Sequence, residues 1–162
     1  EFEGTYFLPE NQLDRFTLRI SMGYPTIEQE VRIILDQPAR KAIEHVQPVM
    51  GGEEVTALQD GLDDVRIDPA VMDYALRFVT ATRKHPHLDL GVSPRGSQAL
   101  LRTAQALALL QGRDYIIPDD IKVMAVPVCA HRVLSKSYID DTHSRPTVEI
   151  ISQIISEIPV PV

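Results

Sequence analysis

The sequence is poor in the features that mark several classes of protein. Its 162 residues contain no tryptophan and only one cysteine. Because a disulfide needs two cysteines, an internal disulfide is excluded. No apolar run approaches the length of a membrane span, and no signal peptide is visible. The formal net charge of −7 provides no overall positive field to attract nucleic acid or an anionic membrane. These absences point to the cytoplasm, and they argue against nucleic-acid partners and membrane insertion.

The remaining composition is that of an ordinary globular chain. Hydrophobic residues make up 44% of the sequence and charged residues 24%. The length suffices for one domain with a core, together with an appendage. Because the chain begins with Glu1 rather than Met, we expect it to be a piece of a longer polypeptide or a processed product.

The strongest helix signal lies in residues 91–112, which read GVSPRGSQALLRTAQALALLQG. Ser93 is a favourable N-cap, and Pro94 follows at the first helical position, where its missing N–H costs nothing. Gly112 suits a left-handed C-terminal cap. The pattern predicts a helix from Pro94 to about Gln111, with an apolar face of Leu100, Leu101, Ala104, Leu107, Ala108 and Leu110.

Arg95 is the unusual residue of this helix. A cation in the first turn faces the positive end of the helix macrodipole, which is mildly unfavourable. The same position is a ready anion site, so an arginine there is explained if a phosphate binds. The alternative is an exposed arginine that is tolerated at a cost of a few tenths of a kcal/mol.

Further helices are expected along the chain after Tyr24-Pro25. Thr26 and Gln29 form a capping-box pair that opens a helix with the apolar residues Ile27, Val31, Ile34 and Leu35. The other expected helices cover residues 38–44, 53–60, 69–83, 118–126 and 147–158, with Pro38 and Pro127 as breaks and with loops at 84–92 and 135–146. A last short piece is expected at 128–133, and a strand is the alternative for 147–158. From Thr26 onward the pattern therefore predicts an α-bundle.

The first 24 residues differ from the rest. Pro9 opens a short possible helix, PENQLDRF. Phe16, Leu18, Ile20 and Met22 then alternate with polar residues, which is the signature of a half-buried strand. A lone strand needs a sheet beside it. We therefore expect the start of the chain to be the edge of an α/β domain whose other strands are absent.

Some residues could suggest a metal or a nucleophile. His85 and His87, with Asp89, could form part of a metal site, but two histidines without a further ligand cluster are weak evidence, and we expect no metal. Cys129 lies in an apolar run and is better explained as a small core residue than as a nucleophile.

The acidic clusters also have structural explanations. Asp119 and Asp120 suit the first turn of a helix, and Asp140-Asp141 suits a solvated loop, so neither pair requires magnesium. The acidic residues between 53 and 64 favour a solvated face, with a docking surface for a basic partner as the alternative.

Several of these segments, taken in order, resemble one family. The motifs LPENQLDRF, GVSPRGSQALLRTAQALALLQGRDYIIPDDIK and AHRVL resemble the MoxR branch of the AAA+ ATPases over essentially the whole chain. The resemblance implies a mainly α fold, with a helical-bundle lid domain over residues 25–162. Residues 1–24 would then be a helix–strand remnant of the α/β nucleotide-binding core.

The resemblance also implies roles for two arginines. Arg15 in LDRF matches the arginine finger, which acts in trans on the γ-phosphate held by the neighbouring subunit. Arg95 in SPRG, with Ser93 and Pro94, matches sensor 2, which contacts the nucleotide of its own subunit. Phosphoryl transfer is accelerated by neutralising charge on the γ-phosphoryl oxygens, and a guanidinium grips phosphate in a fork.

The sequence departs from the family in three places. It has no GxxxxGK[ST] loop and no apolar strand ending in an acidic pair. We therefore expect ATP and Mg²⁺ in the full-length protein only, with neither binding nor hydrolysis by this chain alone. Ile117 stands where the family often has a capping Thr or Ser, so that helix start could be frayed.

The partners that the resemblance implies are other proteins. They are a homo-oligomeric ring, with six subunits as the expected size, and a client protein or an adhesion-type-domain partner that is remodelled or assembled. The alternative is a helical protein-interaction module without a nucleotide role.

Overall fold

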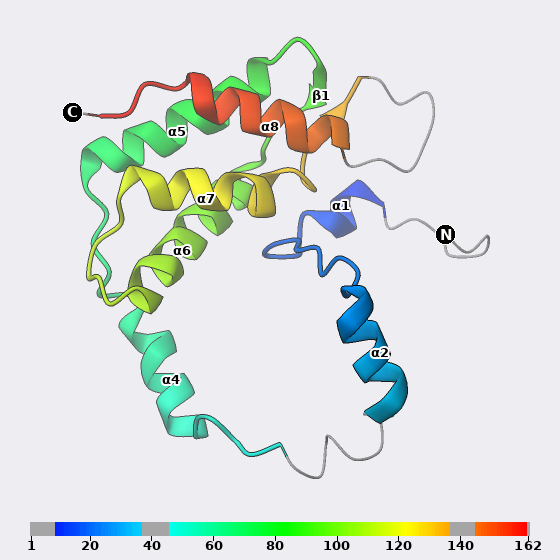
Figure 1. Ribbon diagram of the computed structural model, residues 1–162. Helices are drawn as coiled ribbons and strands as arrows, with labels where there is room; N and C mark the ends of the chain where they lie inside the picture. The colour runs from blue at the N-terminus through cyan, green and yellow to red at the C-terminus, as the bar shows by residue number, and fades with distance from the viewer. Residues whose placement is uncertain (1–8, 37–45, 137–144, 162) are drawn as a thin grey trace. The chain divides into compact units, whose positions relative to one another are not determined.

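The computed structural model describes residues 9–36, 46–136 and 145–161, and it is mainly helical (Figure 1). The elements, in chain order, are α1 (Glu10–Leu13), α2 (Ile27–Asp36), α4 (Gly52–Gly61), α5 (Pro69–Lys84), β1 (Leu88–Leu90), α6 (Pro94–Leu110), α7 (Pro118–Cys129), β2 (Leu134–Ser135) and α8 (Arg145–Glu157). The chain divides into two compact units, residues 1–19 with 61–162, and residues 20–60. The predicted fold class, mainly α, is confirmed.

The larger unit has one hydrophobic core. Helix α6 packs on α7, α7 packs on α8, and α5 contacts all three (Figure 1). The largest fully buried apolar side chains are Tyr74, Phe78, Leu100, Ile121 and Ile151, and they come from all four helices. Cys129 is also buried, as its apolar surroundings predicted.

Helices α5 and α6 begin with the same capping device. The Asp68 carboxylate accepts the Ala70 N–H at 2.8 Å, and the Ser93 hydroxyl accepts the Gly96 N–H at 3.0 Å. A proline occupies the first turn of each helix. Gly112, with φ of 74°, follows the end of α6 in the left-handed region, which glycine adopts without strain. Both predicted helices are therefore confirmed.

Helix α7 corrects two predictions. It runs through Pro127 to Cys129, although Pro127 was expected to break it. Its start is not frayed at Ile117, because the Asp120 carboxylate accepts the Ile117 N–H at 2.8 Å. The same carboxylate pairs with Arg113 through both oxygens, at 2.7 and 2.8 Å. Asp120 therefore supplies the half of a capping box that accepts the N-cap N–H, whereas Ile117 has no side-chain oxygen to accept a first-turn N–H as a Thr or Ser would.

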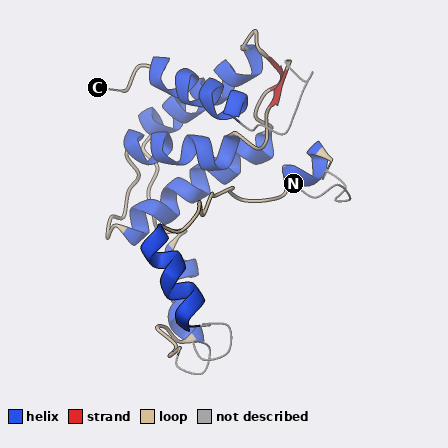
Figure 2. Cartoon of the chain, turned by 45° about the vertical axis from the view of Figure 1, so that its right-hand side comes forward, coloured by secondary structure: helices blue, strands red, loops and turns tan. Residues whose placement is uncertain are grey.

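A small antiparallel sheet was not predicted. Strands β1 and β2 pair Leu88 with Ser135 and Leu90 with Leu134, and Figure 2 shows them in red. Residues 88–90 and Ser135 were expected to lie in loops, and no strand was expected at Leu134. Strands of two or three residues are too short to display a period of two, and their pairing depends on the helices that bring them together.

The predicted strand over residues 16–22 is not formed. Phe16 is 44% exposed and Met22 is 91% exposed, and no ladder pairs this stretch within the described residues. The short helix before it is present as α1, which covers four residues. The alternating pattern places apolar side chains on one side of an extended segment. A strand forms only when a neighbouring strand pairs with that segment.

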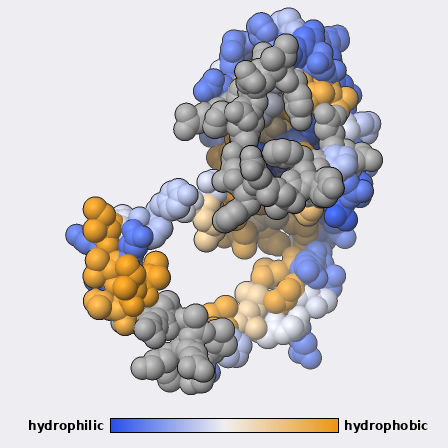
Figure 3. All heavy atoms as spheres, turned by 90° about the vertical axis from the view of Figure 1, so that its right-hand side faces the viewer, coloured by the Kyte–Doolittle hydropathy of each residue, from blue (hydrophilic) through white to orange (hydrophobic). Residues whose placement is uncertain are grey.

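The smaller unit, residues 20–60, contains α2 and α4. The Thr26–Gln29 capping box opens α2 as predicted, with hydrogen bonds of 2.9 and 3.3 Å. Each residue of this unit whose burial is described is exposed, and its apolar side chains lie at the surface, orange in Figure 3. This unit therefore has no hydrophobic core of its own among the described residues.

Three predictions have other outcomes. The expected helix at 38–44, and most of the expected loop at 135–146, lie outside the described residues. The division at residue 24 into core and lid stays a prediction, and the compact units are divided differently.

Among the described helices, none has both the length and the apolarity that crossing a membrane requires.

Candidate functional site

The candidate site lies at the N-terminus of α6, where the segment that follows α1 meets it. Ser93 caps α6 and also donates its hydroxyl proton to the Asp14 carboxylate, at 3.0 and 3.2 Å to the two oxygens. The two residues are 79 positions apart in the sequence. Each is close to one of the arginines singled out above, Arg15 and Arg95, so the fold brings the two motifs LDRF and SPRG together.

The side chains of Arg15 and Arg95 are both exposed. Arg15 lies over the ring of Phe16, with 5.1 Å between its guanidinium carbon and the ring centroid. Among the described residues, no carboxylate forms an ion pair with either arginine. Neither charge is neutralised inside this part of the structure, and both remain available to an external anion. Pro94, between Ser93 and Arg95, is exposed as well.

Arg132 lies beneath this surface and holds the segment after α1. Its side chain is 1% exposed. Its guanidinium donates to the carbonyl oxygens of Asp14, at 3.2 Å, and Thr17, at 3.1 Å. It also donates to the carbonyls of Phe16 and Val128. Burial lowers the pKa of Arg132, and the Asp14 carboxylate, 3.2 Å from Nε, opposes that shift.

His131 lies beside Arg132 and contacts the same segment. Its Nε2 is 3.0 Å from the Phe16 carbonyl oxygen and 2.9 Å from Nη1 of Arg132. Burial lowers the pKa of His131, and the charges of Arg132 and Arg19 add to this effect. The ring is therefore held neutral more firmly than that of an exposed histidine.

Gly96 makes this packing possible. A Cβ at Gly96 would lie 2.7 Å from Cγ1 of Val92 and 3.0 Å from Cδ of Arg132, so a larger residue would push against the Arg132 stem. At Gly91 a Cβ would lie 2.5 Å from Cα of Arg83, because the loop before α6 passes directly over the end of α5. The glycines of GVSPRG are therefore packing residues.

Sequence reasoning identified part of this site. It singled out Arg15, Ser93, Pro94 and Arg95, but not the residues that join them, namely Asp14, Gly96, His131 and Arg132. His131 and Arg132 entered only as letters of the motif AHRVL. Their partners in the segment after α1 lie 115 residues or more away in the chain, and no local spacing rule reaches that far.

The other groups considered in the sequence form no binding site where the structure describes them. The rings of His85 and His87 are 5.6 Å apart, and within the described ranges no group of three potential metal ligands is found. Asp119 lies in the first turn of α7, as predicted, and it pairs with Lys122 at 2.9 Å. Burial raises the pKa of Cys129 to about 12, which makes its thiol unreactive at neutral pH. Asp140 and Asp141 lie outside the described residues.

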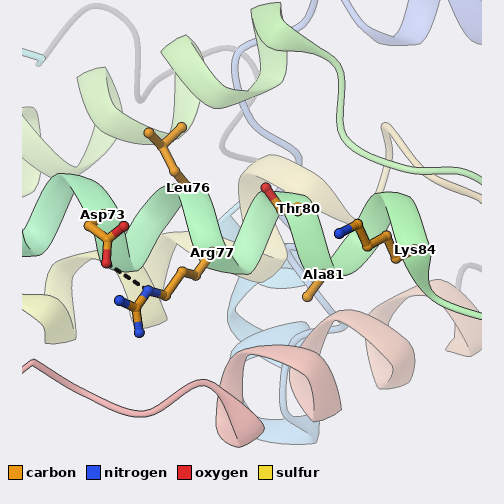
Figure 4. A pocket seen from close by; sticks show the side chains of 6 residues that line it. All are labelled: Asp73, Leu76, Arg77, Thr80, Ala81 and Lys84. Atoms are coloured by element: carbon orange, nitrogen blue, oxygen red, sulfur yellow. Dashed lines mark ion pairs between the residues drawn. The ribbon is translucent and has the colours of Figure 1, made fainter.

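A shallow hollow lies along helix α5, apart from the candidate site (Figure 4). Its lining residues are Asp73, Leu76, Arg77, Thr80, Ala81 and Lys84. The Asp73 carboxylate and Nε of Arg77 form an ion pair at 2.6 Å, drawn as the dashed line. Two of the polar lining side chains are therefore paired with each other.

Comparisons with known proteins point to a single family. A family model described as the AAA lid domain matches residues 80–154. The uncharacterised protein YeaC of Bacillus subtilis is 42% identical over 168 residues, which cover 100% of this chain and 50% of YeaC. The chaperone MoxR1 of Mycobacterium tuberculosis is 33% identical over 171 residues, covering 99% of this chain and 44% of MoxR1. The resemblance to the MoxR family of AAA+ ATPases is confirmed.

A solved structure agrees with this assignment. The crystal structure of a protein from Cytophaga hutchinsonii, described as a candidate ATPase, matches with a TM-score of 0.84 at 28% sequence identity. The match covers 100% of this chain and 52% of that protein. The MoxR-related chain therefore spans about half the length of the relatives that it matches.

Proposed function

We propose that this chain is the arginine-finger and lid portion of a MoxR-type AAA+ ATPase, whose ATP hydrolysis drives remodelling or assembly of partner proteins. The observation that carries the proposal is the Ser93–Asp14 hydrogen bond. It joins the segments that contain Arg15 and Arg95, and both of these arginines are exposed and lack an ion pair among the described residues. The family match and the name of the MoxR1 chaperone support the same proposal.

Arg95 would act as sensor 2. It occupies the first turn of α6, where the helix macrodipole and the unpaired N–H groups favour an anion. Ser93 and Pro94 fix the start of this helix, so the guanidinium is offered from a rigid element. A phosphate of the nucleotide bound to the same subunit is the anion that this position fits.

Arg15 would act as the arginine finger on the nucleotide of the neighbouring subunit. In phosphoryl transfer, catalysis consists largely of neutralising charge on the transferred group, and such an arginine contributes roughly 10³–10⁵ in rate. The guanidinium is permanently charged and binds two phosphate oxygens in a rigid planar fork, a geometry that the ammonium group of a lysine does not offer.

The rest of the chemistry would come from another part of the protein. The chain has no phosphate-binding loop and no acidic pair to hold Mg²⁺, so MgATP would be bound by a nucleotide-binding half. Subunits would assemble in a ring, because a finger that acts in trans requires a neighbour. A client or an adhesion-type-domain protein would be the substrate, and the cytoplasm the location.

A calorimetric titration tests whether nucleotide binding requires the nucleotide-binding half of the protein. The 162-residue chain should bind MgATP too weakly to measure, because the phosphate cradle is absent. Micromolar binding by this chain alone would contradict the proposal.

Arginine substitutions in the full-length protein test the two roles. Arg15→Ala and Arg95→Ala should each lower the ATPase rate by at least about 100-fold, whereas Arg77→Ala, on the exposed face of α5, should leave it unchanged. Activity of the Arg15→Ala protein should return in part when subunits with an intact finger are mixed in. If both variants keep the wild-type rate, the chain is a helical interaction module without a nucleotide role.

A further inference from the structure

The segment after α1 is docked on the end of α7 by a dense set of polar contacts. The Arg19 N–H donates to the Pro127 carbonyl at 2.8 Å. Pro127 and Val128 lie in the last turn of α7, where carbonyl groups lack intrahelical partners. The Val128 carbonyl is taken by Arg132. Residues 14–19 and the Arg132 side chain therefore complete the C-terminal end of α7.

Asp14 joins this anchor to the start of α6. One of its carboxylate oxygens is 3.2 Å from Nε of Arg132 and 3.0 Å from the Ser93 hydroxyl. The same hydroxyl accepts the Gly96 N–H. Contacts thus run without a gap from Arg132 through Asp14 and Ser93 to the first turn of α6.

Charge makes this connection responsive to an anion. The Asp14 carboxylate forms an ion pair with the buried Arg132 guanidinium, 3.2 Å from Nε. Burial is the main cause of the lowered pKa of Arg132, and the charge of Arg95 lowers that pKa slightly further. The two cations therefore repel each other. An anion bound by Arg95 would offset that repulsion and strengthen the hold of Arg132 on residues 14–17.

We propose that Asp14 is a positioning residue that locks the Arg15 segment to the Arg95 helix turn. The inference rests on the proposed function and adds regulation to it. Arg95 would contact the nucleotide of its own subunit, whereas Arg15 would reach the nucleotide of the next. Through Asp14, nucleotide bound at Arg95 of one subunit would hold Arg15 of the same subunit more rigidly at the nucleotide site of the next subunit. Such coupling between sites is cooperativity around the ring.

Steady-state kinetics of the full-length ATPase give the first test. Asp14→Asn keeps the size of the side chain but removes its charge. It should lower kcat at least fivefold and bring the Hill coefficient for ATP down towards 1, with the half-saturating ATP concentration changed less than twofold. Ser93→Ala, which keeps the Asp14–Arg132 pair, should lower the Hill coefficient in the same direction. Asp73→Asn, which breaks an exposed ion pair on α5, should change none of these values.

Hydrogen exchange gives a readout that does not depend on turnover. In the wild-type full-length protein, a non-hydrolysable ATP analogue should slow exchange of the Arg19 amide, which is bonded to Pro127. In Asp14→Asn and Ser93→Ala the analogue should still bind, but it should slow this exchange at least threefold less. Equal protection in wild type and both variants would overturn the inference.

The two proposals fail in different ways. If Arg15→Ala and Arg95→Ala abolish hydrolysis while Asp14→Asn keeps the wild-type Hill coefficient, the role assigned to Asp14 is wrong. The proposed function then stands. If Arg15→Ala and Arg95→Ala leave hydrolysis intact, the proposed function is wrong and the role assigned to Asp14 is overturned with it. Circular dichroism of the folded Asp14→Asn protein, compared with Asp73→Asn, separates either result from simple unfolding.

Discussion

Helices α6 and α2 share the same sequence devices and differ in what covers them. Each begins at a capping residue and carries an apolar face at helical spacing. In α6, Leu100, Ala104 and Ala108 are fully buried, whereas in α2, Ile27 is 81% exposed and Leu35 is 75% exposed. A periodic apolar face therefore specifies a helix and the side that seeks burial, but not the surface that buries it.

The stability of the two regions should differ accordingly. Burial of apolar side chains is the main favourable term in folding, and the described part of residues 20–60 has none that is buried. Helices of 10 residues, such as α2 and α4, are marginal in water without packing. The unit that carries Arg95 and Arg132 is the one that the core holds rigid.

Thiol labelling should give the largest contrast between the two regions. Cys129 is buried with a raised pKa, so it should react with a thiol reagent at pH 8 at least about 1,000-fold more slowly than the cysteine introduced by I34C in a C129A background. The measurement is the pseudo-first-order labelling rate by mass spectrometry. Similar rates would mean that the core opens as readily as α2.

Truncation of one side chain in each region comes next. Phe78 is fully buried, and Phe78→Ala should cost about 3–5 kcal/mol of the free energy of unfolding. Ile34 is 67% exposed, and Ile34→Ala should cost less than about 0.5 kcal/mol. Urea unfolding followed by circular dichroism measures both. A large loss for Ile34→Ala would show that the α2 face is covered.

Two ion pairs sharpen the comparison within the larger unit. Asp120, 3% exposed, bonds Arg113 and the Ile117 N–H, whereas Asp73 and Arg77 form an exposed pair within α5. Asp120→Asn should therefore lower the melting temperature clearly more than Asp73→Asn, because it weakens a helix start as well as a pair. Equal shifts in differential scanning calorimetry would contradict this account of α7.

The smallest expected effect is a pH dependence from His131. Its pKa is lowered in the folded chain, so the unfolded chain takes up the proton first as pH falls. Stability from the neutral ring is fully present above about pH 6.5, the ordinary pKa of histidine, and it should fall as pH drops below that value. His131→Gln should flatten the dependence between pH 7 and 5.5. Unfolding free energies in urea at each pH provide the measurement.

The predictable features were those set by contacts between residues close together in the chain. The starts of α2, α5 and α6 follow from Thr26, Asp68 and Ser93, because a cap bonds an N–H only two or three residues away. The same local reasoning expected a break at Pro127, which the packing of α7 on α6 and α8 overrides. It also expected a strand at residues 16–22, which forms only against a neighbour that the described residues do not supply.

The sequence by itself determined the helical class of this protein and the capped starts of α2, α5 and α6, and it singled out Arg15 and Arg95. Only the tertiary structure decided that Asp14 meets Ser93 and that Arg132 lies buried under both. The reason is the separation along the chain of the residues that interact. Capping and periodicity act within a few residues of the chain, whereas a buried cation finds its carboxylate and carbonyl partners only when packing brings segments more than 100 residues apart together.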